Sequence, residues 1–144
     1  MAYEDGVEES APSPYAFSIG GVNFNDYSKV KMLTLDSNAD DAGPITLHDA
    51  GVDYQVPVGK VFIAFRALAK IEGTGSTIGR IGESDTADGA ISREVLKLAN
   101  GTIYPFMVSI IGIFAAGKYV TGESDHGTYT MQTGTVLYGI EVDA

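Results

Sequence analysis

The sequence predicts an all-β protein built as an antiparallel β-sandwich. The apolar residues, 44% of the 144-residue chain, are rich in Val, Ile, Phe and Tyr, which suit a pleated sheet. The 18 glycines are scattered along the chain, as expected where many short strands need many tight turns. Turn residues interrupt the apolar runs at intervals of roughly 8 to 12 residues, a spacing typical of sandwiches.

The chain divides into an acidic N-terminal arm, residues 1–14, and one β domain, residues 15–144. The arm has four carboxylates and no lysine or arginine, and its prolines at positions 12 and 14 favour an extended course. Its composition alone is typical of a disordered tail. We predict instead that it becomes ordered along a neighbouring subunit, through a salt-sensitive contact. The partner-binding residues expected from this are Tyr3, Glu4, Asp5, Glu8, Glu9 and Tyr15.

In the first part of the β domain, short apolar runs predict strands separated by polar loops. Residues 15–24 alternate in polarity around Gly20-Gly21, and residues 30–35 precede a polar loop at residues 36–43. Residues 52–57 alternate again. We expect each of these runs to form a strand.

The strongest run, residues 60–71, is also predicted to be a strand. Strict alternation would place on one face Val61, Ile63, Phe65, Ala67, Ala69 and Ile71. A helix is the alternative, because residues 64–70 are good helix formers. The turn sequences on either side, Val-Pro-Val-Gly and Glu-Gly-Thr-Gly, favour the strand.

Residues 91–99 are ambiguous between helix and strand. Ile91, Val95 and Leu98 would share a helical face, and Asn100-Gly101 would end a helix well. The same dipeptide also suits a hairpin turn after a strand. We favour the strand.

The remaining runs predict strands at residues 76–81, 103–108, 110–114, 119–121, 128–133 and 136–142. The core residues expected from the alternation are Ile63, Phe65, Ile111, Ile113, Leu137 and Ile140. For a core phenylalanine, truncation of Phe65 to alanine should cost about 3–5 kcal/mol.

Two short sequences recur along the chain. Residues 56–61 and residues 114–119 both consist of an apolar residue, two further residues, Gly-Lys and the start of a strand. Gly-Glu-Ser-Asp occurs at residues 82–85 and again at residues 122–125. Both echoes are what a sandwich needs at equivalent corners, where glycine supplies an unusual φ.

Charge and composition exclude several classes of function. Nineteen acidic residues against nine basic ones give a net charge of −10, which opposes direct binding to nucleic acid. Cysteine is absent, so thiolate chemistry is excluded. The first residues contain neither a basic nor an apolar signal region, and the longest apolar run is too short to span a membrane. We expect a protein that is made in a cytoplasm and binds no membrane.

The residues do not assemble into a catalytic site, so we expect no enzyme and no cofactor. His48 and His126 are the two candidate bases, and the neighbouring Asp49 and Asp125 would point to opposite faces of a strand. Calcium remains an alternative at two acidic loops, residues 36–40 and 85–89. The first departs from an EF-hand loop, because Asp41 stands where glycine is required and Leu47 where glutamate is.

The eight tyrosines leave two kinds of surface open. Tyrosines along strands can form an aromatic platform for sugars. They are also common at subunit interfaces, where an amphipathic ring is welcome. We favour the interface.

Strand and turn sequences in residues 52–142 resemble those of jelly-roll capsid decoration (cement) proteins of tailed bacteriophages. The resemblance is carried by residues 54–63, 78–85, 114–120 and 134–142. It implies a jelly-roll-like sandwich that forms a homotrimer on the outside of the phage head, where it clamps neighbouring major capsid proteins. The family contributes no catalytic residues.

The function expected from the residues and the resemblance together is structural. The chain would be a virion protein that binds the major capsid protein and itself. A carbohydrate- or receptor-binding sandwich, as in a viral fibre, is the alternative. The two differ in where the tyrosines and carboxylates lie: in one exposed groove for a receptor-binding module, between subunits for a decoration protein.

Overall fold

A computed structural model of the chain describes residues 18–19, 22–23, 29–39, 43–72, 78–99, 106–124 and 130–144. All its regular elements are β-strands, and all their pairings are antiparallel, which confirms the predicted fold class. The strands are β1 (Ser18–Ile19), β2 (Val22–Asn23), β3 (Lys31–Thr34), β4 (Ile45–Thr46), β5 (His48–Asp49), β6 (Val52–Asp53), β7 (Lys60–Ala69), β8 (Ile71–Glu72), β9 (Ile78–Ser84), β10 (Arg93–Ala99), β11 (Phe106–Phe114), β12 (Tyr119–Ser124), β13 (Thr130–Met131) and β14 (Val136–Asp143).

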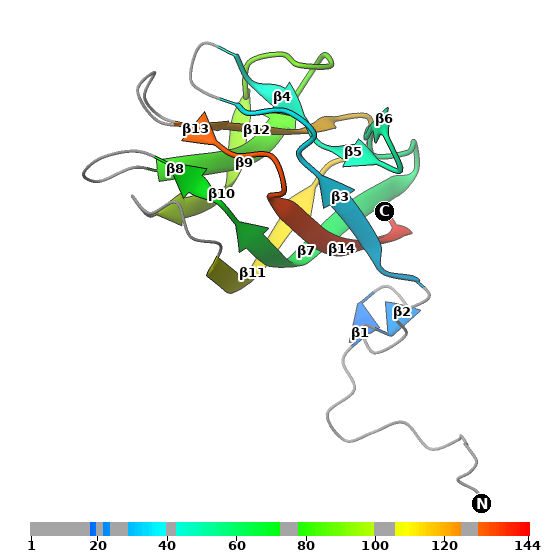
Figure 1. Cartoon of the computed structure of the whole chain (residues 1–144). Coiled ribbons are helices and arrows are strands. Elements are labelled where there is room, and N and C mark those ends of the chain that lie inside the picture. The colour runs from blue at the N-terminus through cyan, green and yellow to red at the C-terminus, as the bar shows by residue number, and fades with distance from the viewer. Residues whose placement is uncertain are drawn as a thin grey trace, which may run out of the picture.

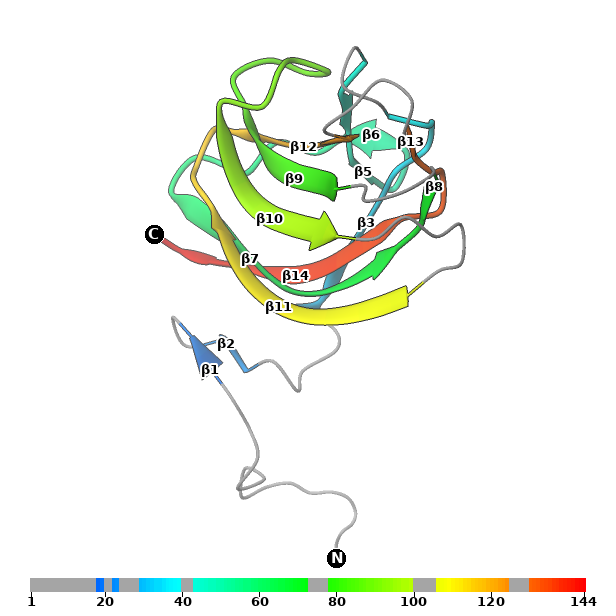
Figure 2. The same cartoon turned by 90° about the vertical axis from the view of Figure 1, so that its left-hand side faces the viewer.

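Two sheets form the sandwich (Figures 1 and 2). The larger sheet has the order β11-β7-β14-β3-β5-β6, and the smaller has the order β10-β9-β12-β4. Figure 2 shows β9, β10 and β12 as one curved layer over a second layer of β7, β14 and β11. Two further two-stranded pairs, β1 with β2 and β8 with β13, complete the described pairings.

The strands of the two sheets pair in a nested order. β3 pairs with β14, β4 with β12, β7 with β11, and β9 with β10. The first strand of the set therefore lies beside the last, the second beside the second from last, and so on inward. The chain is a long antiparallel ribbon whose innermost pair is β9–β10, wound across both sheets.

The main core lies between the two sheets. The larger sheet contributes Leu33, Phe62 and Leu137, and the smaller sheet contributes Ile81 and Val120. All of these side chains are buried. Tyr54, Phe62 and Phe114 form a chain of ring contacts at one end of the core, with centroids 5.2 and 6.0 Å apart.

In β7, strict alternation predicted the wrong side of the sheet for some residues, because the strand contains a bulge. The register with β14 shifts between Gly139 and Tyr138, so that Ala64 and Arg66 pair with successive residues of β14 and Phe65 is left over. This bulge reverses the alternation. As a result Phe62, Ala64, Ala67 and Ala69 belong to the main core, whereas Ile63 and Phe65 belong to a second cluster on the other side of the sheet.

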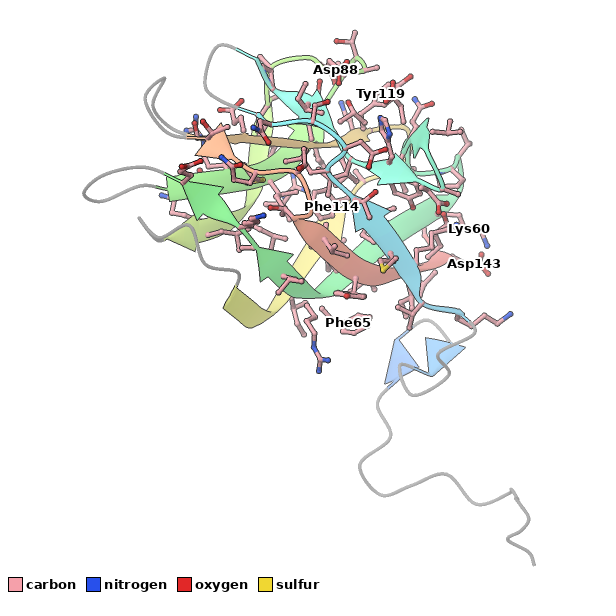
Figure 3. All side chains as sticks on the ribbon, viewed as in Figure 1. Lys60, Phe65, Asp88, Phe114, Tyr119 and Asp143 are labelled. Carbon is pink, nitrogen blue, oxygen red and sulfur yellow. The ribbon has the colours of Figure 1, made fainter. Side chains whose placement is uncertain are left out.

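The predicted core is therefore right in part. Ile63, Leu137 and Ile140 are buried as expected, although Ile63 and Ile140 lie in the second cluster. Phe65 is half-buried, and Figure 3 shows it on the outer side of the larger sheet. Ile111 and Ile113 are exposed, which corrects their assignment to the core. They lie on β11, whose inward residues are Gly112 and Phe114.

Other predictions about elements have definite outcomes. Residues 93–99 form a strand, which settles the ambiguity of residues 91–99 in favour of the strand. β11 is a single strand where two runs were expected, with a register shift between Ser109 and Gly112. The short strands β4 and β5, in residues 45–49, were not predicted. The predicted turn at Asn100-Gly101 lies outside the described residues.

Candidate interaction surface

The structure places the candidate catalytic histidine in a structural role. His48 lies between two carboxylates, with its Nδ1 2.6 Å from Asp36 and its Nε2 2.9 Å from Asp53. These contacts connect the loop after β3 with β5 and β6 at the edge of the larger sheet. Both ring nitrogens have carboxylate partners, so the ring ties three segments together. Asp49, its sequence neighbour, instead accepts a hydrogen bond of 2.8 Å from Lys31. His126 and Asp125 lie outside the described residues.

The two candidate calcium loops use their oxygens within the protein. Asp36 accepts a hydrogen bond from Thr34 and contacts His48. The hydrogen bond from Thr34, followed by the one with His48, lowers the pKa of Asp36. Asn38 accepts a hydrogen bond from the amide of Thr133. In the second loop Asp88 accepts a hydrogen bond from the amide of Thr46. The described residues contain no group of three or more His, Asp or Glu side chains arranged to hold a metal ion.

The first sequence echo corresponds to a real structural equivalence, whereas Gly82 and Gly122 of the second echo do not have the unusual φ that was expected. Gly59 and Gly117 both have positive φ values, of 81° and 78°, and each lies in a turn closed by a backbone hydrogen bond from the following lysine. The two turns are joined directly, since the amide of Gly117 donates to the carbonyl of Val56. Glycine is required at both positions because other residues rarely adopt this conformation.

The Gly-Glu-Ser echo places two buried glutamates on neighbouring strands. Glu83 on β9 accepts two hydrogen bonds from Arg93, of 2.9 and 2.7 Å, and one of 2.6 Å from the amide of Ala115. Its side chain is only 5% exposed, and the hydrogen bonds from Arg93 hold its pKa below the ordinary value. Glu123 on β12 forms an ion pair with Arg80 of β9. Both glutamates therefore act as structural ions that fasten strands of the smaller sheet.

The outer side of the larger sheet has several large apolar side chains exposed. Its centre is the second cluster, in which buried Ile63, Ile140 and Val142 pack with Val30, Val61 and Phe65. Around the centre lie three large side chains that a single chain leaves exposed: Met32 at 52%, Ile111 at 61% and Ile113 at 51%. We call this surface, made of Met32, Ile63, Phe65, Ile111, Ile113 and Ile140, the outer apolar face.

The register of the sheet places these residues in rows across the strands. Ile113 of β11 is opposite Ile63 of β7, which is opposite Ile140 of β14. In a second row Arg66 of β7 is opposite Tyr138 of β14, which is opposite Met32 of β3. The surface therefore continues over four strands. Contiguous apolar patches of this kind on a soluble domain mark sites of interaction.

An open groove of about 700 Å³ adjoins the outer apolar face. The groove shares Met32 with the outer apolar face, and Val30, which packs against the second cluster, also lines it. The other residues that line the groove are Lys29, Lys31, Asp49, Ala50, Lys60 and Glu141. The hydrogen bond to Asp49 raises the pKa of Lys31, and the one to Asp143 raises the pKa of Lys60. Tyr54 donates a hydrogen bond of 2.9 Å to Glu141, and its burial is the main cause of a raised pKa, so its phenol stays a donor.

The outer side of the smaller sheet is polar by contrast. In one row across it Lys97 of β10 is opposite Arg80 of β9, which is opposite Glu123 of β12. Arg80 pairs with Glu123, and Lys97 pairs with Glu94 on its own strand. This difference makes the outer side of the larger sheet the better candidate for a contact surface.

The six residues predicted to bind a partner, Tyr3, Glu4, Asp5, Glu8, Glu9 and Tyr15, lie outside the described residues. Sequence reasoning missed the outer apolar face. A signal for it exists, since β7 and β14 have large apolar residues on both faces, but alternation alone does not say which face lies in the core.

Comparison with known proteins gives no relative. No protein family, no curated protein and no solved structure matches the chain. Within the described residues, no helix is long and apolar enough to cross a membrane.

Proposed function

We propose that this chain is a structural virion protein: a homotrimeric decoration (cement) protein that binds the outside of a tailed-phage head. It is not an enzyme, and it acts by contacting further copies of itself and the major capsid protein. The observation that carries the proposal is the outer apolar face. Met32, Ile111 and Ile113 are exposed on a sheet surface that extends over four strands. Exposed apolar surfaces of this kind are expected on a subunit that has been separated from its partners.

The strand order supports the resemblance to jelly-roll decoration proteins. β3 pairs with β14, β4 with β12, β7 with β11 and β9 with β10, and a nested pairing of this kind is expected where a long hairpin folds across two sheets to make a jelly roll. We propose on this basis that the sandwich is a jelly roll. Fold alone does not assign function, so the proposal depends on the contact surface as well.

The charge suits a place on the outside of a virion. The net charge of −10 of the chain opposes contact with packaged nucleic acid. It also favours solubility at high concentration. We propose that the protein is made in the cytoplasm of the host and added to the capsid exterior. A closed trimer would then multiply weak contacts with the shell into a firm hold.

The alternative, a carbohydrate- or receptor-binding module, requires an exposed groove with aromatic side chains. The groove beside the outer apolar face is lined by aliphatic and charged residues, and no aromatic residue is among its described lining. Tyr54, which donates a hydrogen bond to Glu141 of the groove lining, is buried in the core. These observations favour the structural function.

The assembly can be tested by size-exclusion chromatography with light scattering. We expect a trimer at micromolar concentration and physiological salt, with an interface that buries upward of about 2,000 Å² in total. The second step is co-sedimentation with phage heads that lack the protein, in which an unrelated acidic protein of similar size controls for trapping. A chain that stays monomeric and remains in the supernatant would contradict the proposal.

A further inference from the structure

We propose that the outer apolar face binds the acidic N-terminal arm, residues 1–14, of a neighbouring copy of this chain. The inference deepens the proposed function, since it rests on an assembly of copies and names one of the contacts that would hold it together. The proposed contact joins a surface that the structure describes to a segment whose composition is given by the sequence.

The described structure leaves three large apolar side chains exposed around the buried Ile63 and Ile140 at the centre of this surface. Ile111 and Ile113 project from the edge strand β11, and Met32 from β3 on the far side of β7 and β14. Each is more than half exposed in the single chain. Covering them removes apolar area from water, a change worth about 25 cal/mol per Å².

The charge of the surface selects the segment that fits. Arg66 lies in the row that crosses the face, and Lys29 lines the adjoining groove. Neither has a carboxylate partner among the described residues, whereas in the same groove Lys31 pairs with Asp49 and Glu141, and Lys60 pairs with Asp143. The arm offers Glu4, Asp5, Glu8 and Glu9 with no cation of its own. Cations on the surface and carboxylates on the arm are complementary.

The length of the arm suits the distance to be covered. Fourteen extended residues reach about 45 Å. Four neighbouring strands, β11, β7, β14 and β3, span about 15 Å from the first axis to the last. An extended arm can therefore cross the whole face and still bridge the gap between two copies. Proline favours an extended chain, so Pro12 and Pro14 are expected to reduce the entropy that the arm loses when it binds.

The absence of cysteine from the chain makes a direct test possible. One chain would carry Ala11→Cys in the arm, and a second chain with a tag of different size would carry Ile113→Cys on the face. After the two are mixed, dissociated mildly and reassembled, oxidation should form a disulfide between the differently tagged chains. The matched control replaces Ile113→Cys by Lys97→Cys, because Lys97 is exposed on the polar outer side of the smaller sheet.

We expect severalfold more mixed disulfide with Ile113→Cys than with Lys97→Cys, and less of it as salt is raised. A yield equal to that of the control would overturn the inference. So would disulfides formed only between two Ile113→Cys chains, which would indicate that the face binds a second face. A single chain with both cysteines that closes on itself, without linking copies, would show that the arm covers its own sheet.

The outcome also separates this inference from the proposed function. A trimer that binds heads but gives no mixed disulfide would overturn the inference alone. A mixed disulfide in a protein that does not bind heads would support the inference and count against the proposed function.

Discussion

Phe114 and Phe65 show how the environment of one residue type sets its contribution to stability. Phe114 is fully buried between the sheets and contacts the ring of Phe62. Phe65 projects from the bulge of β7 to the outer apolar face and is only half-buried (Figure 3). The two side chains have the same volume, so any difference between their truncations reports burial.

We expect Phe114→Ala to lower the free energy of unfolding by about 3–5 kcal/mol, because it leaves a cavity in the main core. Phe65→Ala should cost the single chain about 1–2 kcal/mol, since only part of its ring leaves water on folding. The cost of about 3–5 kcal/mol expected for Phe65 from the sequence is corrected accordingly. Urea denaturation of both variants and the parent measures the difference. Equal costs for the two would contradict the placement of Phe65.

Glu83 makes the stability of the domain depend on acid. Its pKa is lowered in the folded state, chiefly by the hydrogen bonds from Arg93. A depressed folded pKa means that the stabilisation is fully present above the unfolded value, near 4.5, and is lost as the pH falls through the lower folded value. Asp36 and Asp143 also have lowered pKa values, but they are exposed and contribute little.

We therefore expect Glu83→Gln to reduce the free energy of unfolding by roughly 1.5–3 kcal/mol at pH 7, the range for hydrogen bonds to charged groups. The difference from the parent should shrink as the pH falls below about 4.5, where the parent loses the same stabilisation. Denaturation of both proteins between pH 7 and pH 3 tests this. A difference that stays constant over that range would show that the charge of Glu83 is not what matters.

At the scale of the element, β7 and β14 approach each other unusually closely beside the bulge. A Cβ atom added to Gly139 would lie 2.5 Å from the carbonyl oxygen of Ile63 and 2.5 Å from the ring of Phe62. The first contact is with backbone, which cannot give way without moving the strand. Glycine at position 139 is therefore required by the packing of the two central strands.

Gly139→Ala should accordingly destabilise the domain by about 1–3 kcal/mol, as overpacking does. The matched control is Gly122→Ala on β12, where the nearest atom to the added Cβ would be the flexible Met131 sulfur at 3.1 Å. Thermal unfolding of both variants gives the comparison. A control as destabilised as Gly139→Ala would mean that loss of glycine, and not the close approach, is responsible.

The elements also show how far the sequence predicts the structure. The apolar runs identified the long strands β7, β9, β10, β11, β12 and β14, because β-branched and aromatic residues bounded by turn residues form a local signal. The faces of β7 could not be predicted, since a bulge is set by pairing with β14 and not by the sequence of β7 itself. β4 and β5 are too short to have a period, so they were missed.

At the scale of the whole molecule, the contact surface depends on the correct assignment of faces. Ile111 and Ile113 read as core residues because large aliphatic side chains are usually buried. In the folded domain Gly112 occupies the inward position between them, where an added Cβ would lie 2.6 Å from the side chain of Leu96. The two isoleucines are thus exposed, and under our proposal they contact a neighbouring copy and not the core of their own chain.

The central position of β14 has a consequence for synthesis. β14 lies between β3 and β7, yet β3 begins at Lys31 and β14 only at Val136. At about 5–20 residues per second, a ribosome needs roughly 5–20 s to pass from the first to the second. β3 lacks its β14 partner throughout that interval, and β7 lacks it from the time residues 60–69 are made. Such unpaired edges recruit strands of other chains. The arrival of β14 closes both edges at once, so the larger sheet is completed late, and newly made chains need protection from one another until then.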